Sequence, residues 1–240
     1  GHDGFQPVIK LIEELKADAG KPAWETSEIF PSELKDEIRE LTKNDITAAF
    51  AMKGKQDRYG AIDAIKTAMV ERFTMDEKYT ALQIDFALSA VKAEVLRANT
   101  LSKQTRIDGR KANEVRAIEC EVSLFPSVHG SALFTRGETQ GIVSTTLGTG
   151  QDEQIIDGIE GEYKERFLLS YLFPPYSVGE VTPLRAPSRR EIGHGKLAWR
   201  ALKRALPAKD QFPYTIRVVS EISESNGSSS MATVCGGSMS

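Results

Sequence analysis

Residues 214–237 read YTIRVVSEISESNGSSSMATVCGG and predict a strand, a glycine- and serine-rich loop and a helix, in that order. Ile216, Val218 and Ile222 fall on one face of an extended chain, which suggests a half-buried strand. The Asn-Gly pair at 226–227 favours a turn, and a helical apolar pattern begins at Met231. Such a loop places backbone N–H groups and hydroxyls at the positive end of a helix dipole. That geometry binds phosphate.

Two other interpretations of this serine run stay open. The run is not a Walker loop, because the pattern GxxxxGK[ST] is absent, and it is not a nucleophile elbow, because no GxSxG surrounds the serines. A serine hydrolase would have to use Ser229 with His194 and an acid that we cannot assign. The plainer alternative is an Asn-Gly turn followed by an N-cap serine.

A second helix start lies in APSRREIGHGK, residues 186–196. Ser188 and Glu191 are three residues apart and fit a capping box, in which each side chain accepts from the other residue's backbone N–H. We expect the helix to run from about Arg189 to about Leu206, because Pro207 stops it.

Two arginines at this helix start call for an explanation. Arg189 and Arg190 fall in the first turn, where the helix dipole disfavours cations. A bound anion would make their electrostatic energy at this position favourable. His194 lies one turn beyond Arg190 on nearly the same face. The alternative is a solvated basic helix start with a packed histidine. Two phosphate-compatible helix starts in one domain favour a single site made by both.

Composition sets the wider limits. The 240 residues are 40% hydrophobic and 27% charged, with net charge −3, so any polyanion site must be a local patch. Cys120 and Cys235 form neither a disulfide framework nor a zinc motif, and we expect both thiols to be buried. No apolar run reaches the length of a membrane span and no signal peptide is apparent, which favours a soluble protein of the cytoplasm, with no membrane partner.

The first part of the chain, from about Phe5 to Ala98, follows a helical pattern. It predicts a small helical bundle, with Pro31 and Ser32 as entry and cap of its second helix. The apolar face of that helix is expected to contain Leu34, Ile38 and Leu41. Because this part offers no phosphate loop, metal spacing or nucleophile, we expect it to pack or to act as a spacer.

The pattern changes after a turn signal at Asp108 and Gly109. Strand-like runs follow at 117–125, 131–148, 165–176 and 214–223, with a hairpin turn expected in RGET, residues 136–139. The fold class is therefore α+β: an all-helical bundle at 1–98, then a mixed α/β domain at 99–240. Both ends look cut, so we expect a segment of a longer polypeptide.

Five stretches together resemble bacterial polynucleotide phosphorylases. They are RIDGR (106–110), HGSALFTRGETQ (129–140), FPPYSVGE (173–180), RREIGHG (189–195) and FPYTIRVVSEISESNGSSSMA (212–232). The resemblance implies that residues from about 100 to 240 are the second ribonuclease PH-like domain of that family, truncated at its C-terminus. It also implies that residues up to 98 are the helical linker domain, preceded by the last residues of another domain.

The implied activity is that of a phosphorolytic 3′→5′ exoribonuclease acting in mRNA degradation. Inorganic phosphate, the co-substrate, would attack the 3′-terminal phosphodiester of single-stranded RNA and release a nucleoside 5′-diphosphate, and the reverse reaction would polymerise diphosphates. By resemblance, Arg189, Arg190 and His194 match the family's catalytic residues, and Ser229 and Ser230 match its phosphate-binding serines.

The resemblance also implies a cofactor and partners. The family's Mg²⁺ or Mn²⁺ ligands would follow Ser240, so we expect no metal ligand in this chain and no activity from this segment alone. A homotrimer and recruitment to an RNA degradosome are further implications. Asp108 is interpreted as a turn residue, whereas Arg136 and Thr139 could serve the fold or contact RNA.

Two related functions remain as alternatives. The first is a non-catalytic ribonuclease PH-like ring subunit. Such a subunit would not need to keep Arg189, Arg190, His194 and the paired serines, so their presence argues against it. A stand-alone ribonuclease PH that trims tRNA would not carry the long helical segment ahead of the domain.

Overall fold

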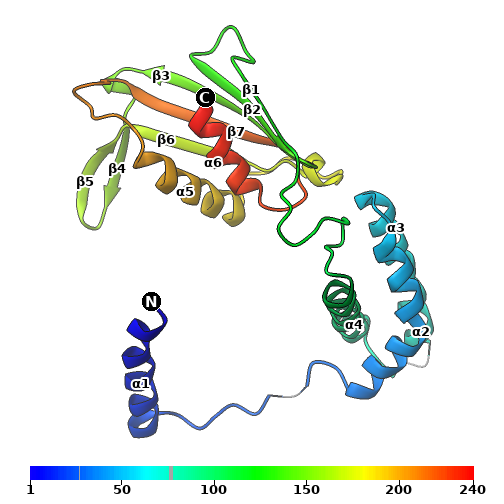
Figure 1. The fold of residues 1–240 in the computed structure, drawn as a ribbon. Helices are drawn as coiled ribbons and strands as arrows, with labels where there is room; N and C mark the ends of the chain where they lie inside the picture. The colour runs from blue at the N-terminus through cyan, green and yellow to red at the C-terminus, as the bar shows by residue number, and fades with distance from the viewer. Residues whose placement is uncertain (27, 76–77) are drawn as a thin grey trace. The chain divides into compact units, whose positions relative to one another are not determined.

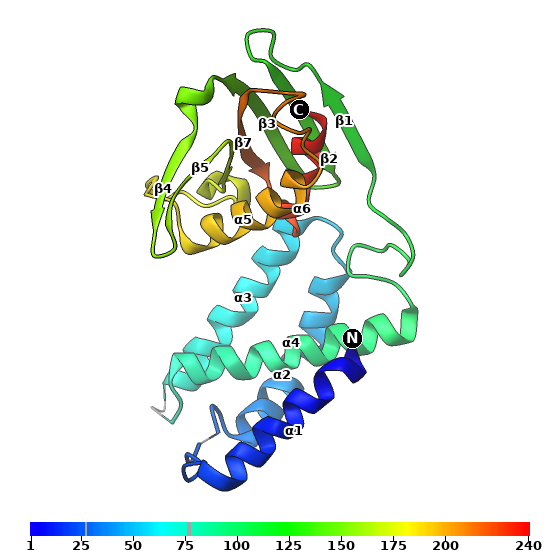
Figure 2. The same ribbon diagram turned by 90° about the vertical axis from the view of Figure 1, so that its left-hand side faces the viewer.

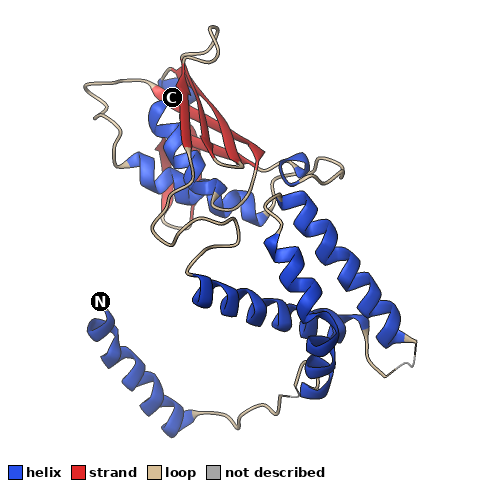
Figure 3. Ribbon diagram, turned by 45° about the vertical axis from the view of Figure 1, so that its right-hand side comes forward, coloured by secondary structure: helices blue, strands red, loops and turns tan. Residues whose placement is uncertain are grey.

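The computed structural model describes residues 1–26, 28–75 and 78–240. These residues form two compact units, Gly1–Glu114 and Val115–Ser240. The first unit is helical, and all the β-strands with names below belong to the second (Figure 3). The sequence-based boundary at residues 98 and 99 lies within the last helix of the first unit.

Four helices make up the first unit. They are α1 (His2–Ala19), α2 (Ser32–Ala51), α3 (Lys55–Thr74) and α4 (Ala81–Lys103). Helices α2, α3 and α4 pack against one another in pairs (Figure 2). Helix α4 begins with a capping box, in which the Thr80 hydroxyl accepts from Gln83 N and the Gln83 side chain accepts from Thr80 N. The core of this bundle is apolar and contains Leu34, Ile38, Ile46, Ile84, Leu88 and Val91.

The bundle departs from the sequence prediction in three places. Leu41 is 38% exposed, and Thr42 takes the third inward position of α2, with its hydroxyl donating to Ile38 O. Ser32 is the first helical residue rather than the cap, because Pro31 occupies the N-cap without a side-chain hydrogen bond. Helix α1 has no buried residue, so the core of the bundle comes from α2, α3 and α4.

The second unit is built on a five-stranded mixed sheet with the order β1-β2-β3-β7-β6 (Figure 1). Its strands are β1 (Ile118–Val122), β2 (Gly130–Arg136), β3 (Thr139–Gly148), β6 (Phe167–Leu172) and β7 (Thr215–Glu224). Only β6 and β7 pair in parallel, and helix α5 (Arg189–Lys203) lies between them in the chain. A separate hairpin pairs β4 (Gln154–Gly158) with β5 (Gly161–Glu165). Two short 3₁₀ helices, Gly150–Asp152 and Pro175–Val178, complete the connections.

Helices α5 and α6 (Ser229–Met239) pack against each other and against the sheet. Between them and the strands lies an apolar core that includes Val143, Phe167, Leu202, Ile216 and Val218. Helix α6 approaches β3 closely, since a Cβ added at Gly236 would lie 2.6 Å from Val143 Cγ2. In register, Tyr171 of β6 pairs with Ser220 of β7, so the side chains of this row face the two helices.

The predicted α+β class is confirmed, and so is the hairpin turn, since Arg136 pairs with Thr139 across Gly137 at φ 57°. The hairpin of β4 and β5 was not predicted, and α5 ends at Lys203 rather than near Leu206. The prediction of buried thiols is wrong: Cys235 is half-buried, and Cys120 is exposed because β1 lies at the edge of the sheet beyond the strands that α5 and α6 pack against. Among the described residues, no helix is long and apolar enough to cross a membrane.

Candidate functional site

The predicted capping box at the start of α5 is present. The Ser188 hydroxyl accepts from Glu191 N at 3.2 Å, and Glu191 Oε2 accepts from Ser188 N at 2.7 Å. The second carboxylate oxygen of Glu191 accepts from Phe173 N at 2.9 Å. Burial would raise the pKa of Glu191, but these hydrogen bonds from Phe173 and Ser188 bring it below its ordinary value. An ionised Glu191 therefore ties the residue that follows β6 to the start of α5.

Arg190 lies over an aromatic ring. Its guanidinium carbon is 4.2 Å from the centroid of Phe173, a cation–π arrangement. The Phe173 ring in turn stacks on Tyr171, with centroids 6.2 Å apart and an interplanar angle of 16°. Arg189 is exposed in the same first turn. The cationic helix start therefore rests on a short aromatic stack rather than projecting freely.

His194 lies one turn further along α5 and also meets Tyr171, with ring centroids 5.3 Å apart. Its Nδ1 is buried and has no hydrogen-bond partner among the described residues. Burial, and secondarily the positive charge of Arg190, lower the pKa of His194 from its ordinary 6.5. The imidazole is therefore neutral near pH 7 in the protein without a bound anion.

The serine loop opens α6 as predicted, but the helix begins at Ser229, two residues before Met231. Ser229 is 2% exposed, and its Oγ lies 2.6 Å from the Tyr171 hydroxyl. Ser230 is partly exposed, and Ser228 occupies the N-cap with φ 56° and no side-chain cap hydrogen bond.

Tyr171 connects the two predicted helix starts. It contacts His194 and Phe173 through its ring and Ser229 through its hydroxyl, and Phe173 in turn contacts Arg190. The structure thus brings Arg190, His194 and Ser229 around one buried tyrosine. Sequence reasoning missed Tyr171: its place two residues after Leu169 on the inward face of β6 was readable, but the partner of its hydroxyl was not.

The loop before α6 is held by the β2–β3 hairpin. Arg136 Nη2 and the Thr139 hydroxyl both donate to Gly227 O, at 2.9 and 3.1 Å. The Thr139 oxygen also accepts from Asn226 N at 3.0 Å, and Thr139 is fully buried. These contacts give both residues a role in the fold, which the sequence had left open.

Asn226 has further partners that the sequence did not indicate. Its carbonyl accepts from Arg116 Nη1 at 2.9 Å, and its side-chain amide donates to Glu138 at 2.7 Å. The turn at Gly137 makes room for the arginine, since a Cβ there would lie 2.9 Å from Arg116 Cδ. The backbone of the serine loop is therefore fixed from three sides, which keeps its N–H groups in place.

The residues present do not fit a metal ion. The described ranges contain no group of three or more His, Cys, Asp and Glu side chains that could hold one. Asp108 is accounted for otherwise: it accepts from Arg110 N and Nε, in a turn where Gly109 has φ 86°. Its predicted turn role is confirmed.

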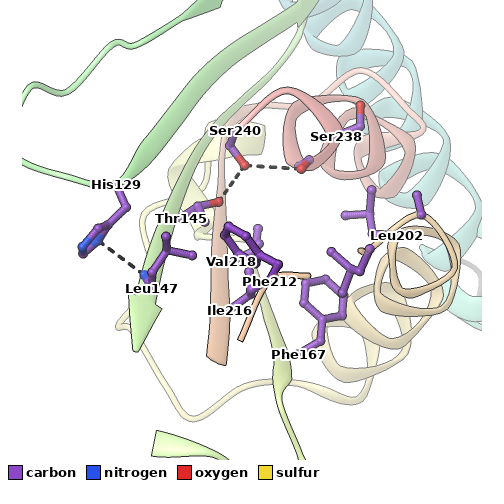
Figure 4. A pocket seen from close by; sticks show the side chains of 13 residues that line it. His129, Thr145, Leu147, Phe167, Leu202, Phe212, Ile216, Val218, Ser238 and Ser240 are labelled. Carbon is purple, nitrogen blue, oxygen red and sulfur yellow. Dashed lines mark hydrogen bonds between the residues drawn. The ribbon is translucent and has the colours of Figure 1, made fainter. Parts of the chain in front are cut away.

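Two pockets of the second unit lie near the candidate site residues. One of about 670 Å³ lies between β6, α5 and the β4–β5 hairpin and reaches Tyr171 and Glu191. The other, of about 330 Å³, lies at the opposite end of α6 from Ser229 and is mostly apolar (Figure 4). Arg190 and Ser229 line neither of these two pockets.

Comparison with known proteins matches both units. Residues 114–240 match the model described as "3' exoribonuclease family, domain 1". Residues 33–111 match one described as "Polyribonucleotide nucleotidyltransferase, RNA binding domain", a segment for which the sequence predicted packing or spacing alone.

Curated relatives are similar over the whole chain. The polyribonucleotide nucleotidyltransferases of Rickettsia canadensis and Rickettsia africae are 56% and 57% identical over 242 residues, covering 100% of this chain and 32% of each relative. The chain thus spans about a third of the length of these relatives. A solved structure titled "archaeoglobus fulgidus exosome with RNA bound to the active site" is 19% identical, with a TM-score of 0.45 over 62% of this chain and 59% of that chain. The chain belongs to the 3′ exoribonuclease family, and over its whole length it is similar to polyribonucleotide nucleotidyltransferases.

Proposed function

We propose that this chain contributes the phosphate- and RNA-end-binding surface of a phosphorolytic 3′→5′ exoribonuclease. The enzyme transfers the 3′-terminal nucleotide of RNA to inorganic phosphate and releases a nucleoside 5′-diphosphate. One observation carries the proposal: two helix starts, one with arginines and one with serines, meet at Tyr171. The family match and the name shared by the relatives support the same reaction.

Each group has a role that its chemistry suits. The backbone N–H groups at the start of α6 and the Ser230 hydroxyl hold the phosphate ion, together with Ser229. Arg189 and Arg190 neutralise the phosphate and the scissile phosphodiester, whose negative charges would otherwise repel each other. A phosphate oxygen forms the new P–O bond, and the bond to the 3′ oxygen breaks, leaving a 3′ hydroxyl after protonation. No covalent serine intermediate is needed.

His194 is assigned to the same surface as a neutral group that can donate or accept a proton. Its lowered pKa allows it to hydrogen-bond without adding a charge near pH 7. Its position one turn from Arg190 supports a role beside the phosphodiester.

The first unit is proposed to bind RNA. The description of the matched domain supports this role. So does a pocket of about 170 Å³ that Lys53, Lys103 and Arg106 help to line, because cations there suit the phosphodiester backbone. Dependence on Mg²⁺ or Mn²⁺, the homotrimer, the degradosome contact, the role in mRNA degradation and the cytoplasmic location stay predictions that rest on the resemblance.

Product analysis tests the reaction. The full-length protein that contains this chain is incubated with single-stranded RNA, with and without inorganic phosphate, and the products are separated by mass. We expect degradation only with phosphate, and nucleoside diphosphates as the products. Release of monophosphates without phosphate would mean hydrolysis and would contradict the proposal.

A further inference from the structure

The contact between Tyr171 and Ser229 joins two buried hydroxyls. Tyr171 is 3% exposed and Ser229 is 2% exposed, and their oxygen atoms are 2.6 Å apart. Tyr171 lies on the edge strand β6, which pairs with β7, and reaches Ser229 at the start of α6, the helix that packs over β2, β3 and β7. A buried hydrogen bond between two side chains 58 positions apart fixes the first residue of α6 against the sheet.

The direction of this hydrogen bond decides what Ser229 can do. A serine hydroxyl has one proton, so a serine that donates to Tyr171 has no proton left for an anion. When Tyr171 donates, Ser229 accepts and its own proton is free to point to the loop. Burial raises the pKa of Tyr171, and the hydrogen bond with Ser229 opposes this only in part, so the phenol keeps the proton it would donate.

The aromatic stack connects the same tyrosine to the arginine. Phe173 contacts both the Tyr171 ring and the Arg190 guanidinium, and its backbone N–H donates to Glu191. A shift of Tyr171 would therefore move the serine and the arginine relative to each other. No other described side chain bonds the Ser229 hydroxyl in the structure.

We propose that Tyr171 is a positioning residue. It donates to Ser229, so that the serine proton points toward a phosphate bound at the start of α6. Through Phe173 it also fixes the position of Ser229 relative to Arg190. The inference rests on the proposed function, because it assumes that the anion at this surface is the phosphate co-substrate. In this proposal Tyr171 acts through Ser229, whose Oγ its hydroxyl contacts, and does not itself bind the phosphate.

The test removes only the hydroxyl. Tyr171→Phe keeps the ring that packs on Phe173 and His194. Binding of inorganic phosphate to the full-length protein is measured by calorimetry, and the KM values for phosphate and for RNA are measured separately. We expect the Kd and KM for phosphate to rise about threefold to tenfold, as for a lost hydrogen bond, with the KM for RNA unchanged. Tyr214→Phe, at an exposed tyrosine of the same unit, is the matched control and should change neither.

A double variant separates positioning from general loosening. If Tyr171 acts through Ser229, Tyr171→Phe should add nothing to the phosphate Kd of Ser229→Ala. An unchanged phosphate Kd in Tyr171→Phe would overturn the proposal. So would parallel increases in the phosphate Kd and the RNA KM, or additive effects in the double variant.

The binding measurement also separates this proposal from the proposed function. A wild-type protein that binds phosphate but yields no diphosphates would contradict phosphorolysis, while the ratio of phosphate Kd values would still test Tyr171. A wild-type protein that yields diphosphates, together with an unaffected Tyr171→Phe variant, would leave the function standing and reject the positioning role.

Discussion

The guanidinium carbon of Arg190 lies 4.2 Å from the centroid of the Phe173 ring, and Phe173 N donates to the carboxylate of Glu191, the next residue after Arg190. The arginine and the ring beneath it are therefore fixed by consecutive residues of one helix start. Such a cation is placed before any anion arrives, which reduces the side-chain entropy lost on binding. The cost of holding positive charge against the helix dipole is then offset when the anion binds.

Replacing Arg190 should reduce phosphorolysis much more than stability. Arg190→Ala removes a charge-assisted contact worth about 1.5–3 kcal/mol, so kcat/KM should fall about tenfold to a hundredfold. Thermal melting should change little, because a first-turn cation opposes the dipole when no anion is bound. Arg200→Ala, at an exposed position of the same helix, is the control. A large drop in melting temperature with normal activity per folded molecule would make Arg190 a structural residue.

Phe173→Leu tests the ring beneath the arginine. The substitution keeps an apolar side chain but removes a cation–π contact worth about 0.5–1 kcal/mol at a partly exposed site. Phosphate affinity should fall about twofold to fivefold, less than in Arg190→Ala. In the Arg190→Ala background the same substitution should have no further effect on phosphate affinity. An equal loss in both backgrounds would show that Phe173 acts independently of Arg190.

Thr139→Val should loosen the serine loop. The hydroxyl that bonds both Asn226 N and Gly227 O is lost, and a part-buried backbone N–H is left without this partner. We expect a loss of about 1–3 kcal/mol in the free energy of unfolding, together with weaker phosphate binding. Thr146→Val on the same strand is exposed and should be neutral. Chemical denaturation measures the first effect and calorimetry with phosphate the second; full stability in Thr139→Val would contradict the anchoring role.

Local rules account for what the sequence could predict. The capping box depends on Ser188 and Glu191 three residues apart, and the hairpin on a glycine that accepts a positive φ, so neither needs the rest of the fold. Arg190, His194 and Ser229 were predicted as site residues from local helix-start patterns and from the resemblance. Helix starts and tight turns are readable because their partners are close in the chain.

Long-range partners account for what was missed. Tyr171 and Ser229 are 58 residues apart, and Arg116 and Asn226 are 110 apart, so no local pattern marks either pair. Cys120 shows the same limit: its apolar stretch suggests burial, but β1 lies beyond the strands that α5 and α6 pack against. Knowing which strand is central requires the whole sheet.

The last prediction concerns the charge of His194. Burial and the nearby Arg190 hold its pKa below 6.5 in the folded protein. As the pH falls below about 6.5, the unfolded chain therefore binds more protons at His194 than the folded protein does. His194 thus lowers the free energy of unfolding in acid and has no such effect above that pH range. A dianion bound beside Arg190 would favour the imidazolium form, raising the pKa of His194. Anion binding near pH 6 should then take up protons.

Sulfate is the probe for this uptake, because it does not itself titrate near pH 6, unlike phosphate. Calorimetry of sulfate binding to the full-length protein in two buffers of different ionisation enthalpy measures the protons taken up. We expect uptake in the wild type and in His129→Gln, whose exposed histidine lies at the far end of α6, and its loss in His194→Gln. Equal uptake in the wild type and His194→Gln would place the titrating group elsewhere. Absence of proton uptake in the wild type would show that anion binding does not raise the pKa of His194.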